Sequence, residues 1–141
     1  MRKTLFLTLA LLACLGLGSC DKNKNKTTDP LQSTVWTAYD NDYLMVLKFE
    51  LGTVASFYIG DENLNRRNDV VYSPYTLADN TRLSFSSLNG RMDNERFRFK
   101  TGTLDGDSMT VVYDRWTSVS GIDSPKEHKQ AVFTKRTATK K

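Results

Sequence analysis

A two-residue alternation of apolar and polar side chains runs through most of this chain and limits the folds open to it. The clearest case is Arg96-Phe97-Arg98-Phe99-Lys100. Successive side chains of a strand point to opposite faces, so this run predicts a strand with Phe97 and Phe99 in a core. We interpret Arg96, Arg98 and Lys100 as its solvated face, in preference to an anion-binding stripe. Because no apolar pattern of helical period persists after residue 31, we predict an all-β fold.

Eight runs are predicted to be strands: 34–40, 43–51, 54–60, 70–77, 81–88, 95–104, 108–115 and 129–135. The predicted turns include Gly52-Thr53, Asp79-Asn80, the segment 89–94 and Asp105-Gly106-Asp107. Such residues tolerate unusual backbone angles, so neighbouring runs are expected to pair as antiparallel hairpins. We predict an eight-stranded antiparallel up-and-down barrel, which leaves no exposed sheet edge. A sandwich is the alternative, with a crossover through residues 61–69.

The inward phase of these strands supplies an apolar set that can fill a small barrel. Its members are Trp36, Ala38, Met45, Leu47, Phe49, Ala55, Phe57, Ile59, Val71, Tyr75, Leu77, Leu83, Phe85, Phe97, Phe99, Met109, Val111, Tyr113, Ala131 and Phe133. An eight-stranded barrel is either filled by side chains or open enough for one small ligand. The alternation is the same in both cases, so both stay open at this point.

The N-terminus has the order of a secretory signal. Arg2 and Lys3 precede a 13-residue apolar stretch at 5–17, and the small residues Gly18 and Ser19 precede Cys20. A stretch of this length is shorter than the roughly 18 to 20 residues of a membrane-spanning helix. An ordinary signal cleaved near Gly18 or Ser19, with a free thiol at Cys20, is the alternative.

The segment Leu17-Gly18-Ser19-Cys20 resembles the lipobox of bacterial lipoproteins. The resemblance implies a diacylglycerol on the Cys20 sulfur, cleavage before Cys20 and a further acyl chain such as palmitate on the new amine. It divides the chain into a signal peptide at 1–19, a lipidated cysteine and spacer at 20–30, a barrel domain at 31–136 and a basic tail at 137–141. Cys14 is removed with the signal, so we expect no disulfide in the domain.

The net charge of +4 arises from the two ends of the chain. Residues 31–134 carry 11 Lys and Arg against 14 Asp and Glu, a net charge of −3. This balance argues against a nucleic-acid partner. The polar segment 21–30 predicts a flexible spacer. The expected location is the bacterial cell envelope, at the outer membrane or cell surface. Asp21 is an inner-membrane sorting cue in some bacteria, which leaves the final membrane open. We expect a monomer.

The domain is similar to the lipocalin-like small lipoproteins of Gram-negative bacteria, within the calycin group. The similarity spans residues 31–136 and depends on an entry strand that leads to Trp36, and on a late hairpin at 97–111. Thr34 stands where lipocalins have a glycine, two residues before the tryptophan. The resemblance implies a cation from the last strand, Lys135 or Arg136, stacked over Trp36 at the barrel floor. A plain core tryptophan is the alternative.

Residues for catalysis are sparse in the domain. His128 is its one histidine, no Gly-x-Ser-x-Gly elbow occurs, and zinc sites need several His or Cys ligands. Oxygen-rich segments at residues 40–42, 61–63 and 105–107 lack the full spacing of a calcium loop and are interpreted as turns. We therefore expect neither an enzyme nor a bound metal or other cofactor.

A long polar segment, 116–128, is predicted to be a rim loop. Aromatic residues at this mouth and in the interior are the candidate ligand-binding residues: Trp116, Tyr72, Tyr75, Phe57, Phe97 and Phe99.

The first functional hypothesis is a lipid-anchored barrel that binds a small apolar or amphipathic ligand without catalysis. The second is an interaction or inhibitor protein whose filled barrel presents the 116–128 segment to an envelope protein or glycan. A core packed solid by Phe57, Phe85, Phe97, Phe99 and Phe133 would contradict the first hypothesis, and an open lumen would weaken the second.

Overall fold

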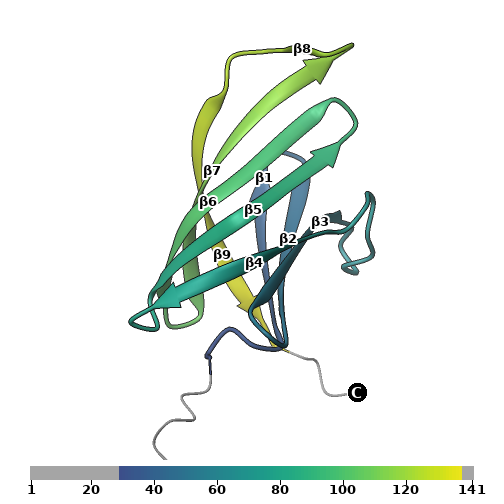
Figure 1. Cartoon of the computed structure of the whole chain (residues 1–141). Coiled ribbons are helices and arrows are strands. Elements are labelled where there is room, and N and C mark those ends of the chain that lie inside the picture. The colour runs from purple at the N-terminus through teal and green to yellow at the C-terminus, as the bar shows by residue number, and fades with distance from the viewer. Residues whose placement is uncertain (1–28, 138–141) are drawn as a thin grey trace, which may run out of the picture.

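The computed structural model describes residues 29–137 as a sequence of nine strands (Figure 1). They are β1 (Thr34–Asp40), β2 (Tyr43–Glu50), β3 (Val54–Gly60), β4 (Val71–Ala78), β5 (Arg82–Met92), β6 (Glu95–Asp105), β7 (Ser108–Val119), β8 (Ile122–Asp123) and β9 (Glu127–Arg136). Cys20 and the predicted signal peptide lie outside the described residues. Within 29–137, no helix is long and apolar enough to cross a membrane.

Eight of these strands close into an antiparallel up-and-down barrel. Strands β1 to β7 pair in sequence, β9 pairs with β7, and the barrel closes where Trp36 of β1 lies opposite Lys135 of β9. Strand β8 forms a short hairpin with the end of β7. The predicted barrel is confirmed, and the sandwich alternative is wrong, because the connection at 61–70 joins two paired neighbours, β3 and β4.

Local turn chemistry explains the short connections. Asp79 and Asn80 both adopt positive φ values, 54° and 55°, and Gly52 and Thr53 also have positive φ. These left-handed conformations let a strand reverse within two residues and suit Asn, Asp and Gly. The predicted turns at both places are confirmed.

The core consists of the predicted inward residues, all of which are buried or packed against the buried cluster. The pattern also missed Leu31, Leu88 and Met92. The last two were missed because the β5–β6 ladder shifts register between Ser84 and Leu88, which reverses the inward phase after that point. The predicted turn at 89–94 is consequently shorter, since β5 continues to Met92.

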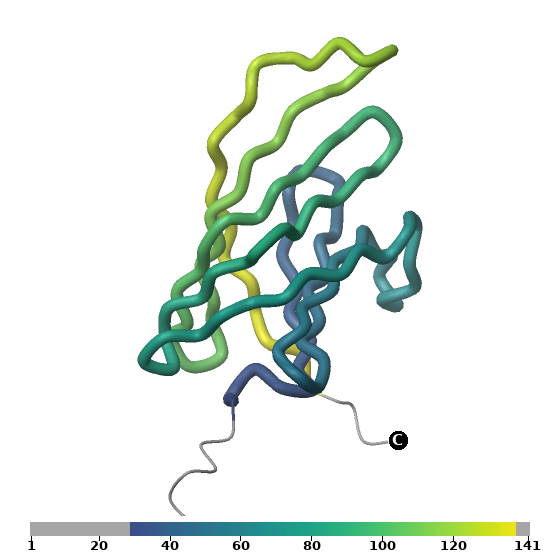
Figure 2. Tube along the Cα trace, viewed as in Figure 1, coloured from purple at the N-terminus to yellow at the C-terminus, as the bar shows by residue number. Residues whose placement is uncertain are grey.

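The two ends of the barrel differ. Both ends of the described chain lie at one of them, together with the turns at 51–53, 79–81 and 106–107; we call this the terminal end (Figure 2). The connections at 41–42, 61–70, 93–94 and 120–126 lie at the opposite end, which we call the hairpin end. Strands β7 and β8 reach furthest there (Figures 1 and 2).

The terminal end is closed by residues just before and within β1. Leu31 is fully buried, and the Asp29 carboxylate accepts bonds from the Leu31 amide at 2.8 Å and the Tyr75 hydroxyl at 2.6 Å. Trp36 is buried and its Nε1 donates to Thr34 Oγ1 at 2.8 Å. Asp29, assigned to the spacer from sequence, therefore contacts the barrel.

Of the two cations that the resemblance implied over Trp36, Lys135 lies directly opposite Trp36 in the ladder and Arg136 does not face it. Arg136 lies opposite Val35, so it shares the outer face with Thr37 and donates to Thr37 Oγ1 at 2.9 Å. Trp36 points inward. One residue of register therefore separates the two side chains onto opposite faces of the sheet.

The predicted rim loop at 116–128 is also largely wrong. Strand β7 continues to Val119, Ser120 and Gly121 form a tight turn with positive φ, and β9 begins at Glu127. The backbone of this polar segment is satisfied by pairing, with Ser118 opposite Asp123. Polarity indicated a loop because both faces of the hairpin lie in water, where alternation is not needed.

Candidate functional site

The barrel axis is occupied by aromatic rings. The Phe57 ring lies 4.6 Å from Phe99 and 5.7 Å from Phe97, and Tyr113 stacks on Phe99 at 5.4 Å between centroids. Phe57, Phe97 and Phe99 are at most 2% exposed. Three of the predicted ligand-binding residues are therefore packed against one another inside the barrel. Phe85 and Phe133 are buried in the same cluster.

The hairpin end of the barrel is closed by a charged network around the buried Asp40 carboxylate. Asp40 accepts a hydrogen bond from the Tyr113 hydroxyl at 2.6 Å and another from Lys129 Nζ at 2.6 Å. Arg115 Nη1 lies 2.9 Å from Asp40 Oδ1, and Arg115 Nε donates to Glu95 Oε2 at 2.9 Å. Sequence reasoning treated residues 40–42 as a turn and missed this role of Asp40.

Arg115 is the link between this network and the aromatic core. Its guanidinium carbon lies 5.1 Å from the Tyr43 ring centroid and 5.6 Å from that of Phe97. Cation–π contacts of this kind gain strength when the cation is desolvated. The charged layer and the aromatic layer therefore pack directly on each other, so the mouth of the barrel is filled.

The ionisation of the network follows from these contacts. Burial alone would raise the pKa of Asp40, but the hydrogen bonds from Lys129 and Tyr113 and the charge of Arg115 outweigh it and hold the pKa below its ordinary value. Burial and the neighbouring Asp40 carboxylate raise the pKa of the Tyr113 hydroxyl. Asp40 is charged and Tyr113 is a donor at neutral pH.

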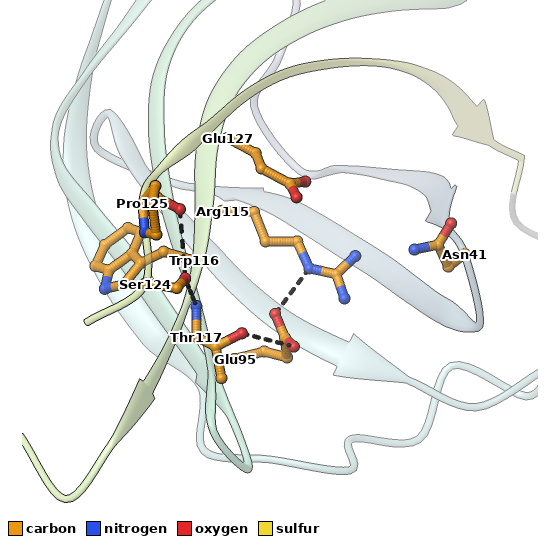
Figure 3. Close-up of a pocket in the computed structure, with 8 residues that line it drawn as sticks. All are labelled: Asn41, Glu95, Arg115, Trp116, Thr117, Ser124, Pro125 and Glu127. Carbon is orange, nitrogen blue, oxygen red and sulfur yellow. Dashed lines mark hydrogen bonds and ion pairs between the residues drawn. The ribbon is translucent and has the colours of Figure 1, made fainter. Parts of the chain in front are cut away.

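A small pocket of about 160 Å³ lies beside this network (Figure 3). Its lining is mostly polar: Asn41, Glu95, Arg115, Trp116, Thr117, Ser124, Pro125 and Glu127. The Thr117 amide donates to Ser124 Oγ at 2.9 Å, which ties β7 to the segment before β9 (Figure 3). Arg115 Nη1 is buried there without a well-aligned hydrogen bond. The size and polarity of this pocket suit water or a small polar group.

The remaining predicted ligand-binding residues do not meet. Trp116 is partly buried on the outer face of β7, with Arg98 at 5.5 Å and Lys126 at 5.0 Å from its ring. Tyr72 is 64% exposed on β4, whereas Tyr75 is buried at the terminal end against Asp29. The predicted mouth, in which Trp116 lies with Tyr72 or Tyr75, is therefore not formed.

A second cluster on the outer face joins His128, Asp114 and Lys100. His128 Nδ1 lies 2.5 Å from Asp114 Oδ1, and Lys100 Nζ lies 3.0 Å from Asp114 Oδ2. Burial would raise the pKa of Asp114, but the bonds to Lys100 and His128 lower it. This contact was not predicted, because the polar sequence around His128 indicated a loop. His128 in fact lies in β9, directly opposite Asp114 of β7.

Among residues 29–137, no group of three or more His, Cys, Asp and Glu side chains is arranged to hold a metal ion.

Comparison with protein-family models, with curated proteins and with solved structures found no match for this chain. The barrel is consistent with a calycin-like fold, and the finer resemblance to lipocalin-like lipoproteins stays a prediction.

Proposed function

We propose that this protein is a membrane-tethered interaction protein whose filled barrel presents its hairpin end to a protein partner. The observation that carries the proposal is the occupied interior. Phe57, Phe97 and Phe99 pack on one another at the axis, and Arg115 and Asp40 close the mouth above them. A barrel built to hold an apolar ligand needs free volume there, so this packing favours the partner-binding hypothesis over the small-ligand one.

The hairpin of β7 and β8 is the proposed contact surface. Val119 and Ile122 lie opposite each other beside its turn and are 50% and 76% exposed. Apolar side chains at the tip of an extended hairpin gain free energy when a partner covers them, at about 25 cal/mol per Å² of apolar surface buried. Hairpin tips held by a rigid scaffold are common binding elements.

The position of the predicted tether also supports the β7–β8 hairpin as the contact surface. The described chain begins at Asp29, at the end of the barrel opposite Ile122 (Figures 1 and 2). If Cys20 carries the predicted lipid, the barrel is tethered through its terminal end, which leaves the hairpin end free to meet a partner. The proposed partner is therefore an envelope or extracellular protein, and the proposed role is non-catalytic.

A photo-crosslinking experiment tests the partner surface. A photoreactive residue is placed at Ile122 in the full-length protein in its native cell, with Leu51 as the matched control. Leu51 is 74% exposed but lies at the terminal end. We expect a discrete adduct from Ile122 and none of the same size from Leu51. Equal adducts at both positions, or none at Ile122, would contradict the proposal.

Two further measurements test the other parts of the proposal. Metabolic labelling with a fatty acid is expected to mark the wild type and not Cys20→Ser, and equal labelling would contradict the lipid tether.

Native mass spectrometry of protein purified from its own cell is expected to give the mass of the lipidated chain alone. A retained apolar ligand would instead support the small-ligand hypothesis.

A further inference from the structure

The outer face of β5 and β6 carries arginines whose charges are not balanced by carboxylates. Arg91 and Arg96 are directly opposite across the two strands, and Arg98 lies opposite Asn89. Like charges at directly opposed positions destabilise a sheet. Within the described residues, these three arginines form no ion pair; Arg96 donates to the carbonyls of Asp93 and Glu95 at 3.0 and 3.1 Å. The sheet therefore carries a cluster of positive charge here, although the repulsion between these arginines lowers its stability.

A surface pocket opens beside these arginines, where the strand pairing is irregular. Between the pairs Ser84 with Thr101 and Leu88 with Phe99, β5 has three residues and β6 has one, Lys100. The resulting pocket has a volume of about 410 Å³, which lies within the range of small-molecule sites. Its lining residues are Phe85, Ser86, Ser87, Asn89, Arg98, Phe99 and Lys100.

The groups around this pocket are held in place by contacts outside it. The Ser73 hydroxyl accepts a 2.8 Å hydrogen bond from the Ser87 amide, which fixes the irregular segment of β5. Lys100 is held 3.0 Å from the buried Asp114 carboxylate. The Trp116 ring holds the Arg98 guanidinium at 5.5 Å. Arg98 is thus held in place at the pocket with no carboxylate partner among the described residues, whereas Lys100 is already paired with Asp114. A cation held in this way needs little reordering to meet an anion.

From this arrangement we infer that the pocket binds an acidic sugar unit of a glycan chain. The anionic group of the sugar pairs with Arg98, since guanidinium groups pair with carboxylate or sulfate. Lys100 lies beside it and keeps its bond to Asp114. The hydroxyl and amide groups of Ser86, Ser87 and Asn89 match the hydroxyl groups of a sugar ring. The chain then continues toward Arg91 and Arg96. This wall site is separate from the hairpin tip, so it goes beyond the proposed function.

The same geometry disfavours other polyanions. Single-stranded nucleic acids are held by free aromatic faces on which bases stack, whereas the ring of Trp116 already has Arg98 and Lys126 against it. A lipid surface is bound by exposed apolar side chains together with cations, and the apolar residues of this pocket, Phe85 and Phe99, are at most 8% exposed. A sugar satisfies both the charge and the polar walls.

This inference departs from the interpretation of Arg96, Arg98 and Lys100 as a solvated face and favours the anion-binding alternative. The alternation of residues in β6 could not predict this pocket, because the pocket depends on the register shift and on Ser86 and Ser87 in the neighbouring strand.

Binding of a galacturonic acid tetramer, measured by calorimetry on the folded wild type, tests the inference, with a galactose tetramer as the neutral ligand control. The variants are Arg98→Ser, and Ser86→Asp, which adds an acid to the pocket. Arg82→Ser is the matched control, since it removes the same charge from the exposed terminal end of β5. Thermal unfolding checks that each variant is folded.

We expect the acidic tetramer to bind and the neutral one not to bind. Arg98→Ser and Ser86→Asp should each weaken binding at least about tenfold, or about 1.4 kcal/mol, and Arg82→Ser less than about twofold. Equal losses in Arg98→Ser and Arg82→Ser would show non-specific attraction and overturn the site. The inference also fails if the acidic tetramer does not bind, if sulfate ion binds equally well, or if single-stranded DNA or anionic vesicles bind more tightly.

Discussion

The hydroxyl of Tyr113 donates a 2.6 Å hydrogen bond to Asp40, and this contact joins β7 to β1 across the hairpin end of the barrel. Lys129 of β9 donates to the other oxygen of the same carboxylate at 2.6 Å. One buried carboxylate thus connects the three strands at the closure of the barrel. Removing one member of such a network leaves the other charges without a partner. The resulting loss of stability is larger than the net stabilisation that the intact network provides.

The stability of the protein should depend on pH through Asp40. Its pKa is lower in the folded state than in the unfolded chain, so its contribution is complete above about pH 4 and is lost as the pH falls further. We expect Asp40→Asn to lower the free energy of unfolding at pH 7 by about 3 to 5 kcal/mol. The difference from wild type should shrink at pH 3, as measured by urea unfolding. Asp105→Asn, at the exposed end of β6, serves as the control. A difference that does not change with pH would contradict the role of Asp40.

Gly90 should not tolerate a side chain. A Cβ placed on Gly90 would lie 2.1 Å from Cε1 of the buried Phe57 ring. We expect Gly90→Ala to lower the free energy of unfolding by about 1 to 3 kcal/mol, through overpacking. Phe57→Leu should cost less in the Gly90→Ala background than in wild type, because the two residues share one space. Additive effects of the two changes in chemical unfolding would argue against this packing.

Leu31 should be essential for the terminal end although it precedes the first strand. It is fully buried, so Leu31→Ala leaves a cavity and is expected to lower the free energy of unfolding by about 2 to 5 kcal/mol. Leu51→Ala at the same end is the matched control, since Leu51 is exposed, and it should change stability by less than about 0.5 kcal/mol. Similar denaturation midpoints for both variants would contradict the packing role of Leu31 at the terminal end.

Tyr75 and Tyr72 should differ sharply although they lie three residues apart. The Tyr75 hydroxyl donates to the Asp29 carboxylate at 2.6 Å, whereas Tyr72 projects from the outer face. We expect Tyr75→Phe to lower the free energy of unfolding by about 1.5 to 3 kcal/mol, the range for hydrogen bonds to charged groups. Tyr72→Phe should leave the melting curve nearly unchanged. A neutral Tyr75→Phe variant would show that Asp29 does not anchor the segment before β1.

The fold was predictable because its main signal is local. In β6, the alternation of Phe97 and Phe99 with cations fixes which face is buried, and the Asp79-Asn80 pair fixes a hairpin. The candidate sites were not predictable in the same way. The Asp40 network joins residues up to 89 positions apart, and the pocket at Ser86 depends on a break in register. Such contacts follow from pairing between strands, and the alternation within one strand does not determine them.

The placement of both chain ends at the terminal end has a mechanical consequence. Strands β1 and β9 extend between the two ends of the barrel in opposite directions (Figure 1). A pull between an anchored N-terminus and a partner at the hairpin is therefore carried along the barrel, from one end of its strands to the other. The ladder hydrogen bonds lie across the strands, so they share such a load in shear and do not open one at a time.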